Sequence, residues 1–124
     1  MLEVGPSPRG GRGVFASRRI DDEVLLMTAP LLLIPGDQRD HLAQTIVDDY
    51  VYEWDEDGTA ALVLGISSMI NHAAEPNAFL WLIPDDTSAE LWSIRPIASG
   101  EEVTVSYRAE GPASPLWFEV EDPA

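Results

Sequence analysis

The sequence contains no cysteine and no lysine. Without cysteine the chain can form no disulfide, no thiolate zinc site and no cysteine nucleophile, which leaves His41 and His72 as its only soft metal ligands. We therefore expect no metal centre. All seven basic residues are arginines, so an enzyme of this composition that modified lysine could not modify itself.

Long apolar segments are also missing. No segment approaches the roughly 18 apolar residues that a membrane span requires, and residues 1–13 lack the apolar stretch of a signal peptide. We expect a cytoplasmic protein that does not contact membranes. The 124 residues, 45% of them hydrophobic, are enough for one compact domain over residues 1–124 and too few for two.

Basic residues are scarce relative to acidic ones, since 22 acidic and seven basic residues give a formal charge of -15. This charge repels nucleic acid phosphates and anionic membranes and attracts basic chains. It predicts a basic protein partner and no direct contact with nucleic acid. A second interpretation, in which the acidic groups only hydrate the surface or reflect the source organism, has equal weight on composition alone.

Short apolar segments separated by glycine, proline and acidic residues favour many short strands over long helices. Residues 55–58 are typical of a hairpin turn, and residues 84–88 indicate another. The predicted strands cover residues 2–4, 14–16, 24–29, 31–34, 50–54, 60–64, 79–83, 91–94 and 103–107.

One short helix is predicted over residues 37–45. Asp37 is placed to accept backbone N–H bonds at its start, and Leu42 and Ile46 have the spacing of residues that pack inward. Residues 108–124 form a tail whose large apolar side chains are expected to dock on the body of the domain.

Two segments combine backbone freedom with polar groups. Gly10-Gly11-Arg12-Gly13 runs into an apolar strand, and glycines let a backbone approach a ligand closely, but a flexible turn is the better interpretation of this segment taken alone. Asn71 offers a donor and an acceptor, and the backbone around His72 could pair with a flat heterocycle such as adenine. Taken alone, His72 is better interpreted as a buried histidine without a ligand.

A third segment, residues 94–107, reads as a strand, a turn containing Gly100-Glu101-Glu102 and a strand ending on Tyr107. The glycine loop followed by Val14-Phe15-Ala16, the segment from Asn71-His72 to Pro76-Asn77, and this third segment, in that order, resemble the SET family. The likeness covers nearly the whole chain and is nearest to the short bacterial, archaeal and viral members. We assign Glu101 and Glu102 no proton transfer, because adjacent residues on a strand or turn point apart and the resemblance makes them structural.

The resemblance implies a mostly β fold, the SET-domain β-clip of several small curved sheets, with a C-terminal pseudoknot in which the last strand passes beneath the Asn71 segment. It also implies S-adenosyl-L-methionine as cofactor. By the same resemblance, the backbone of Gly11, Arg12 and Gly13 holds the methionine part of the cofactor, Asn71 binds its amino group, and the backbone at His72 reads adenine.

On the substrate side, the resemblance places Tyr107 at the active centre and Tyr50 in the lysine channel. Trp117 and Phe118 would close one wall of that channel, with core packing as the alternative role for both. Ala73 and Arg108 depart from the residues common in the family at those positions.

The implied activity is that of a protein-lysine N-methyltransferase acting on a histone-like, nucleoid or ribosomal protein. The alternative from another class is a noncatalytic SET-like module that binds basic proteins. A homodimer, as in the viral relatives, would complete the binding groove of so small a domain.

Overall fold

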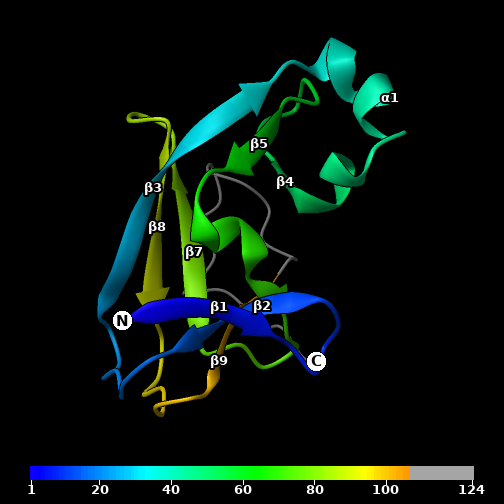
Figure 1. Cartoon of the computed structure of the whole chain (residues 1–124). Helices are drawn as coiled ribbons and strands as arrows, with labels where there is room; N and C mark the ends of the chain where they lie inside the picture. The colour runs from blue at the N-terminus through cyan, green and yellow to red at the C-terminus, as the bar shows by residue number, and fades with distance from the viewer. Residues whose placement is uncertain (107–124) are drawn as a thin grey trace.

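The computed structural model describes residues 1–106, which build two antiparallel-rich sheets around one core (Figure 1). The predicted mostly β architecture is confirmed. The first sheet has the strand order β1-β2-β9-β6 and the second has the order β4-β5-β3-β8-β7. The strands are β1 (Leu2–Pro6), β2 (Arg12–Ala16), β3 (Leu25–Ile34), β4 (Val51–Glu53), β5 (Ala60–Val63), β6 (Asn71–His72), β7 (Ala78–Ile83), β8 (Ser88–Ser93) and β9 (Glu102–Val105).

Strand β3 replaces two predicted strands. The prediction of a break at Pro30 was wrong, because the ten-residue strand continues through the proline and changes its partner there. Residues 25–30 pair with β8, and residues 31–34 pair with β5. Pro30 has no N–H to contribute, but its carbonyl accepts the N–H of Leu64 at 3.1 Å. The proline therefore marks the junction between two ladders, where a missing donor does little harm.

The predicted short helix is confirmed, as a four-residue α-helix that a 3₁₀ turn precedes. The segment consists of a 3₁₀ helix η1 (Gly36–Gln38), α1 (Arg39–Leu42) and a second 3₁₀ helix η2 (Ile46–Tyr50). Neither η1 nor α1 has a side-chain cap, so the prediction for Asp37 was wrong.

The inward packing predicted at the end of this helix is also wrong for one of its two residues. Ile46 is 70% exposed, while Leu42 is half buried. The chain leaves the helical conformation at Thr45, whose side chain caps η2 by accepting the N–H of Val47, so positions 42 and 46 no longer share one helical face.

Arg39 fastens the helical segment to the hairpin of β4 and β5. Its Nη1 donates to the carbonyl of Gly58 at 3.1 Å, and its Nη2 lies 3.3 Å from the carboxylate of Glu53. Tyr50, the last residue of η2, is thereby held next to the start of β4. The hairpin turn predicted at residues 55–58 is confirmed, with Gly58 at a φ of 84°.

Strand β9 lies between β2 and β6, as the predicted pseudoknot requires. It pairs antiparallel with β2 and parallel with β6, where Asn71 is opposite Thr104 and His72 is opposite Val105. The N–H of Ala73 extends the parallel ladder by donating to the carbonyl of Val105 at 3.0 Å. Strand β9, near the end of the described chain, thus pairs directly with β2 from its first third and, on the other side, with β6.

The core fills the space between the sheets. Its largest fully buried side chains come from both sheets and from the turn before β9. Burying each one stabilises the fold by about 1.5 to 3 kcal/mol. These core side chains are Val14, Val63, Leu91, Ile97, Val103 and Val105.

Within residues 1–106 no helix is long and apolar enough to cross a membrane.

Candidate functional site

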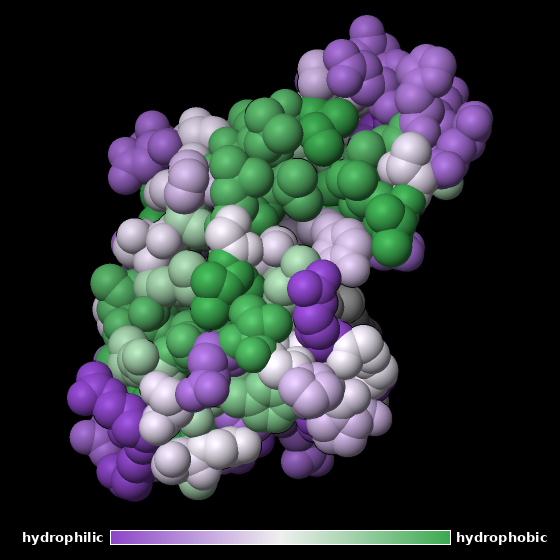
Figure 2. All heavy atoms as spheres, viewed as in Figure 1, coloured by the Kyte–Doolittle hydropathy of each residue, from purple (hydrophilic) through white to green (hydrophobic). Residues whose placement is uncertain are grey.

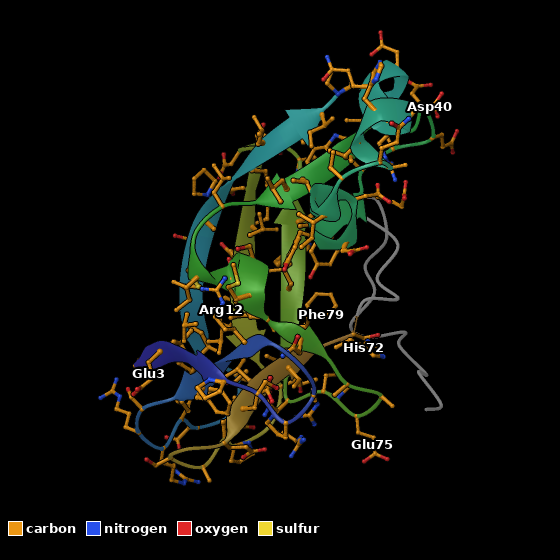
Figure 3. The ribbon with its side chains drawn as sticks, turned by 45° about the vertical axis from the view of Figure 1, so that its right-hand side comes forward. Glu3, Arg12, Asp40, His72, Glu75 and Phe79 are labelled. Atoms are coloured by element: carbon orange, nitrogen blue, oxygen red, sulfur yellow. The ribbon has the colours of Figure 1, made fainter. Side chains whose placement is uncertain are left out.

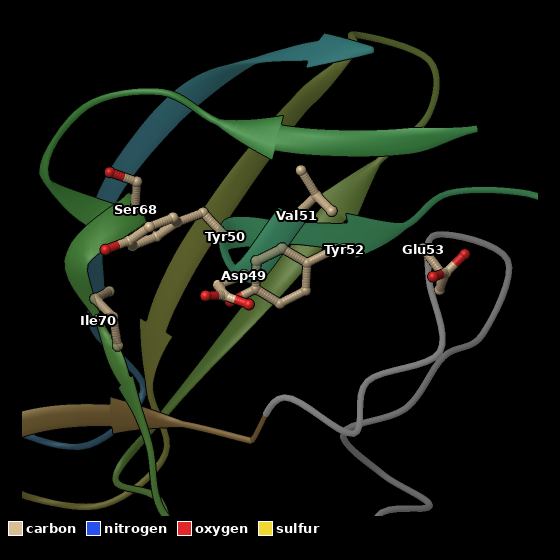
Figure 4. Close-up of a pocket in the computed structure, with 7 residues that line it drawn as sticks. All are labelled: Asp49, Tyr50, Val51, Tyr52, Glu53, Ser68 and Ile70. Carbon is tan, nitrogen blue, oxygen red and sulfur yellow. The ribbon is translucent and has the colours of Figure 1, made fainter. Parts of the chain in front are cut away.

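Two cavities meet at a shared wall formed by Tyr50, Ser68 and Ile70. The glycine cavity, of about 310 Å³, is lined in addition by Gly10, Gly11, Arg12, Met69 and Asn71. The tyrosine cavity, of about 190 Å³, is lined in addition by Asp49, Val51, Tyr52 and Glu53 (Figure 4).

The floor of the glycine cavity is a turn that only glycine adopts easily. Gly10 has a φ of 119° and Gly11 a φ of 58°, and a Cβ built on either would have no described atom within 4 Å. The turn is closed by backbone hydrogen bonds from Ser7 N to Gly11 O and from Gly10 N to Ser7 O. Its backbone is therefore exposed to the cavity, where it can contact a ligand directly.

Asn71 reaches this cavity from β6. Its Nδ2 donates to the carbonyl of Arg12 at 3.0 Å and to Oε2 of Glu102 at 2.8 Å. Its Oδ1 makes no hydrogen bond within residues 1–106 and is the amide's remaining acceptor.

His72 follows Asn71 on β6, and its side chain is exposed, so the buried-histidine interpretation is wrong. Arg12 and His72 are both labelled in Figure 3, and they lie on β2 and β6, the two strands that flank β9 in the first sheet. The backbone of His72 pairs with Val105, and the residue does not line the glycine cavity. Its predicted adenine contact stays a prediction.

Gly13 differs from its two neighbours because it is buried and faces protein atoms. A Cβ at this position would lie 2.3 Å from Oε2 of Glu102 and 3.0 Å from Nδ2 of Asn71. Gly13 therefore lies directly beneath these two side chains and does not line the cavity.

Glu102 is the polar residue of this region that the sequence did not reveal as part of the site. Its side chain is 5% exposed and accepts hydrogen bonds from Ser7 Oγ, Arg9 Nη1 and Asn71 Nδ2. No spacing rule connects these partners, which lie 95, 93 and 31 residues away in the sequence.

The tyrosine cavity contains two aromatic rings from consecutive elements. Tyr50 ends η2 and is 37% exposed, while Tyr52 lies in β4 and packs partly against the core. Figure 4 shows the hydroxyl of Tyr50 directed toward the segment that carries Ser68 and Ile70. Tyr52 was not predicted, although the spacing Tyr-x-Tyr was the available signal.

The predicted residues Tyr107, Trp117 and Phe118 lie outside the described residues. Their roles in the lysine channel stay predictions. In the described part of the site, the glycine cavity and the tyrosine cavity adjoin each other at the three residues that line both.

Comparison with known proteins identifies the family. The family model for the SET domain matches residues 11–108. The chain belongs to the SET domain family. The predicted family is confirmed, and the β-clip fold with it.

The relatives support the enzyme class. A Schizosaccharomyces pombe protein named "Histone-lysine N-methyltransferase, H3 lysine-37 specific" is 32% identical over 121 residues, which are 97% of this chain and 78% of that protein. The Arabidopsis thaliana histone-lysine N-methyltransferase ATX2 is 31% identical over 117 residues, but these are only 11% of its length. The predicted class, a protein-lysine N-methyltransferase, is confirmed by these SET-domain relatives.

Solved structures share the fold. A candidate histone methyltransferase from Plasmodium falciparum has a TM-score of 0.69 and 23% identity, and the likeness covers 89% of this chain and 99% of that one. A humanized mutant of the Chaetomium thermophilum Polycomb Repressive Complex 2 has a TM-score of 0.68 and 21% identity, over 90% of this chain and 15% of that one.

Proposed function

We propose that this SET domain transfers a methyl group from S-adenosyl-L-methionine to the side-chain amine of a lysine on a basic protein. The observation that supports the proposal is the shared wall of the glycine and tyrosine cavities, formed by Tyr50, Ser68 and Ile70, where a cofactor in one cavity and an amine in the other would meet.

The residues of the glycine cavity fit the cofactor. The backbone of Gly11 and Arg12, supported from below by Gly13, would hold the methionine part, and Oδ1 of Asn71 is an acceptor for its ammonium group. The backbone at His72 is the proposed contact for adenine. The bound cofactor supplies a methyl group on a positively charged sulfur.

Methyl transfer requires the substrate lysine to enter the tyrosine cavity with its amine in the neutral, deprotonated form. A free lysine with a pKa of about 10.4 is neutral in fewer than roughly one molecule in a thousand at pH 7. The rings of Tyr50 and Tyr52 form the apolar part of the lining, and burial of the amine against them disfavours its ammonium form, as does the positive sulfur of the bound cofactor. The carboxylates of Asp49 and Glu53 in the same lining act in the opposite direction, so neutral amine forms only when the lysine reaches past them to the rings.

The same side chains position the amine. The tyrosine hydroxyls orient its lone pair toward the shared wall, and alignment of two reactants lowers a barrier by several kcal/mol. The ring faces stabilise the methylated cation by about 0.5 to 2 kcal/mol each. Tyr107 is proposed to complete the catalytic centre, with Trp117 and Phe118 closing the channel.

The surface around the tyrosine cavity favours a basic substrate. Residues 37–57 contain eight acidic side chains and a single arginine, and Asp49 and Glu53 stand at the rim of the cavity itself. Figure 2 shows hydrophilic residues gathered at the end of the molecule that carries α1. This charge would attract a histone-like, nucleoid or ribosomal protein at long range.

The test is incubation of the protein with S-adenosylmethionine carrying a labelled methyl group and a panel of purified histones, nucleoid proteins and ribosomal proteins. We expect label on lysine, identified by mass spectrometry, and loss of most transfer in Tyr107→Phe. Calorimetric binding of S-adenosylmethionine without transfer to any protein of the panel would favour the noncatalytic module instead. Equal transfer by Tyr107→Phe would remove that residue from the mechanism.

A further inference from the structure

Glu102 is a buried carboxylate that the proposed chemistry does not use. It lies on β9, and its oxygens contact the loop before β2 on one side and Asn71 of β6 on the other. Arg9, 45% exposed, balances its charge through an ion pair of 2.9 Å. A buried carboxylate with this complete set of donors is well satisfied, so its presence is compatible with a stable fold.

The chemistry of this contact fixes the orientation of one amide. The carboxylate of Glu102 and the carbonyl of Arg12 are both acceptors, so only the Nδ2 end of Asn71 can face them. Because the amide is planar, its Oδ1 then points away from both oxygens. Asn71 lines the glycine cavity, and this orientation offers the cavity an acceptor and withholds a donor.

Gly13 makes the contact possible. The carboxylate and the amide lie so close above it that a Cβ would overlap Oε2 of Glu102 at 2.3 Å. The backbone at this position is in an ordinary extended strand, so the requirement for glycine is steric and arises from the Glu102–Asn71 pair.

We propose that Glu102 is a positioning residue that selects for a cationic group in the glycine cavity by locking Asn71 with Oδ1 toward the ligand. This inference rests on the proposed function, since it concerns the ammonium end of S-adenosylmethionine. Without the carboxylate, Asn71 keeps only the carbonyl of Arg12 and can rotate to present its N–H₂ group, which repels an ammonium group.

The test compares two ligands by calorimetry. S-adenosylmethionine carries the ammonium group, and 5′-methylthioadenosine lacks the whole amino-acid end. In Glu102→Leu, whose side chain is of comparable size and has no acceptor, we expect the affinity for S-adenosylmethionine to fall roughly tenfold, while the affinity for 5′-methylthioadenosine changes less than about twofold. An equal loss for both ligands, or no loss for either, would overturn the proposal.

A double-mutant cycle distinguishes an effect of Glu102 that acts through Asn71 from a loss of binding that is independent of Asn71. If Glu102 acts through Asn71, Glu102→Leu added to Asn71→Ala causes less than about a twofold further loss of S-adenosylmethionine affinity. Additive losses contradict the proposal. Arg9→Gln removes the ion pair and leaves the contact with Asn71, so the ratio of the two affinities should be unchanged, as in the surface control Glu3→Leu.

Two further measurements test the proposal if Glu102→Leu does not fold or if the wild type binds neither ligand. If Glu102→Leu does not fold, Gly13→Ala displaces the same pair from below and should give the same selective loss. The side-chain amide resonances of Asn71 in nitrogen-15-labelled protein need no ligand, and their exchange with water should accelerate in whichever variant folds; unchanged exchange overturns the proposal. If the wild type binds neither ligand, the proposed function fails, and these resonances still decide the role of Glu102.

Discussion

The side chain of Asn77 forms a hydrogen bond with the backbone of Thr104 on β9, as a neighbouring strand would. Its Oδ1 accepts the backbone N–H of Thr104 at 2.9 Å, and its Nδ2 donates to the backbone carbonyl of Glu102 at 2.8 Å. The side chain is almost completely buried, at 1% exposure. One amide thus continues the ladder that β6 begins at Asn71 and His72, and it keeps β9 beneath the 71–77 segment.

Replacing this amide should destabilise the whole fold. Asn77→Ala leaves a buried N–H and a buried carbonyl without partners, and we expect the free energy of unfolding in urea to fall by about 2 to 4 kcal/mol. Gln44→Ala is the matched control, because it removes an exposed amide and should change stability by less than about 0.5 kcal/mol. Similar values for the two variants would contradict the role of Asn77.

Gly36 sets the distance between the helical segment and the hairpin of β4 and β5. A Cβ there would lie 2.2 Å from the carbonyl oxygen of Asp57, a backbone atom that cannot move alone. We expect Gly36→Ala to lower stability by about 1 to 3 kcal/mol and to speed amide exchange in residues 36–50. Gly5→Ala meets only the ring of Phe15 at 3.6 Å and should be close to neutral.

Substitution of the two tyrosines should have different effects on cofactor binding and on methyl transfer. Tyr50 belongs to both cavities, whereas Tyr52 lines only the tyrosine cavity. We expect Tyr52→Ala to lower methyl transfer by about tenfold or more while leaving the affinity for S-adenosylmethionine within about twofold. Tyr50→Ala should reduce both quantities, measured by calorimetry and by transfer to a basic peptide. A Tyr52→Ala variant with weakened cofactor binding would place the boundary between the cavities elsewhere.

The acidic residues that line the tyrosine cavity should lower the KM for a basic substrate, and this effect should weaken as the salt concentration rises. Asp49 lines the mouth of the tyrosine cavity, and we expect Asp49→Asn to raise the KM for a lysine-containing basic peptide by about two- to fourfold at low ionic strength. The difference should disappear near 1 M salt, where screening shortens the range of the charge to about 3 Å. Asp85→Asn, on the turn between β7 and β8, makes the same change of charge away from the cavity and should leave KM unaltered.

Local patterns predicted most of the strands and both hairpin turns correctly. They also placed the short helix within residues 37–45, but they failed at Pro30, where β3 continues without a break. The outcome there depends on the change of ladder partner from Ser88 to Val63, two distant residues that leave no local signal at Pro30.

The candidate site divides in the same way. Motif resemblance placed Gly11, Arg12, Asn71 and Tyr50 in the sequence, and the structure lines two adjoining cavities with them. Tyr107 and the tail residues stay predictions.

By itself, the amino-acid sequence determined the family, the mostly β class, the glycine turn and the strongly acidic character of the protein. The β class, the glycine turn and the acidity follow from residue types and short spacings, and the family follows from the resemblance of three motifs in their order along the chain. Only the tertiary structure showed that Gly13 lies under Glu102, that Glu102 accepts a hydrogen bond from Asn71 and that Tyr52 lines the same cavity as Tyr50. Such relationships arise when β9 passes between β2 and β6, which brings together side chains that are tens of residues apart.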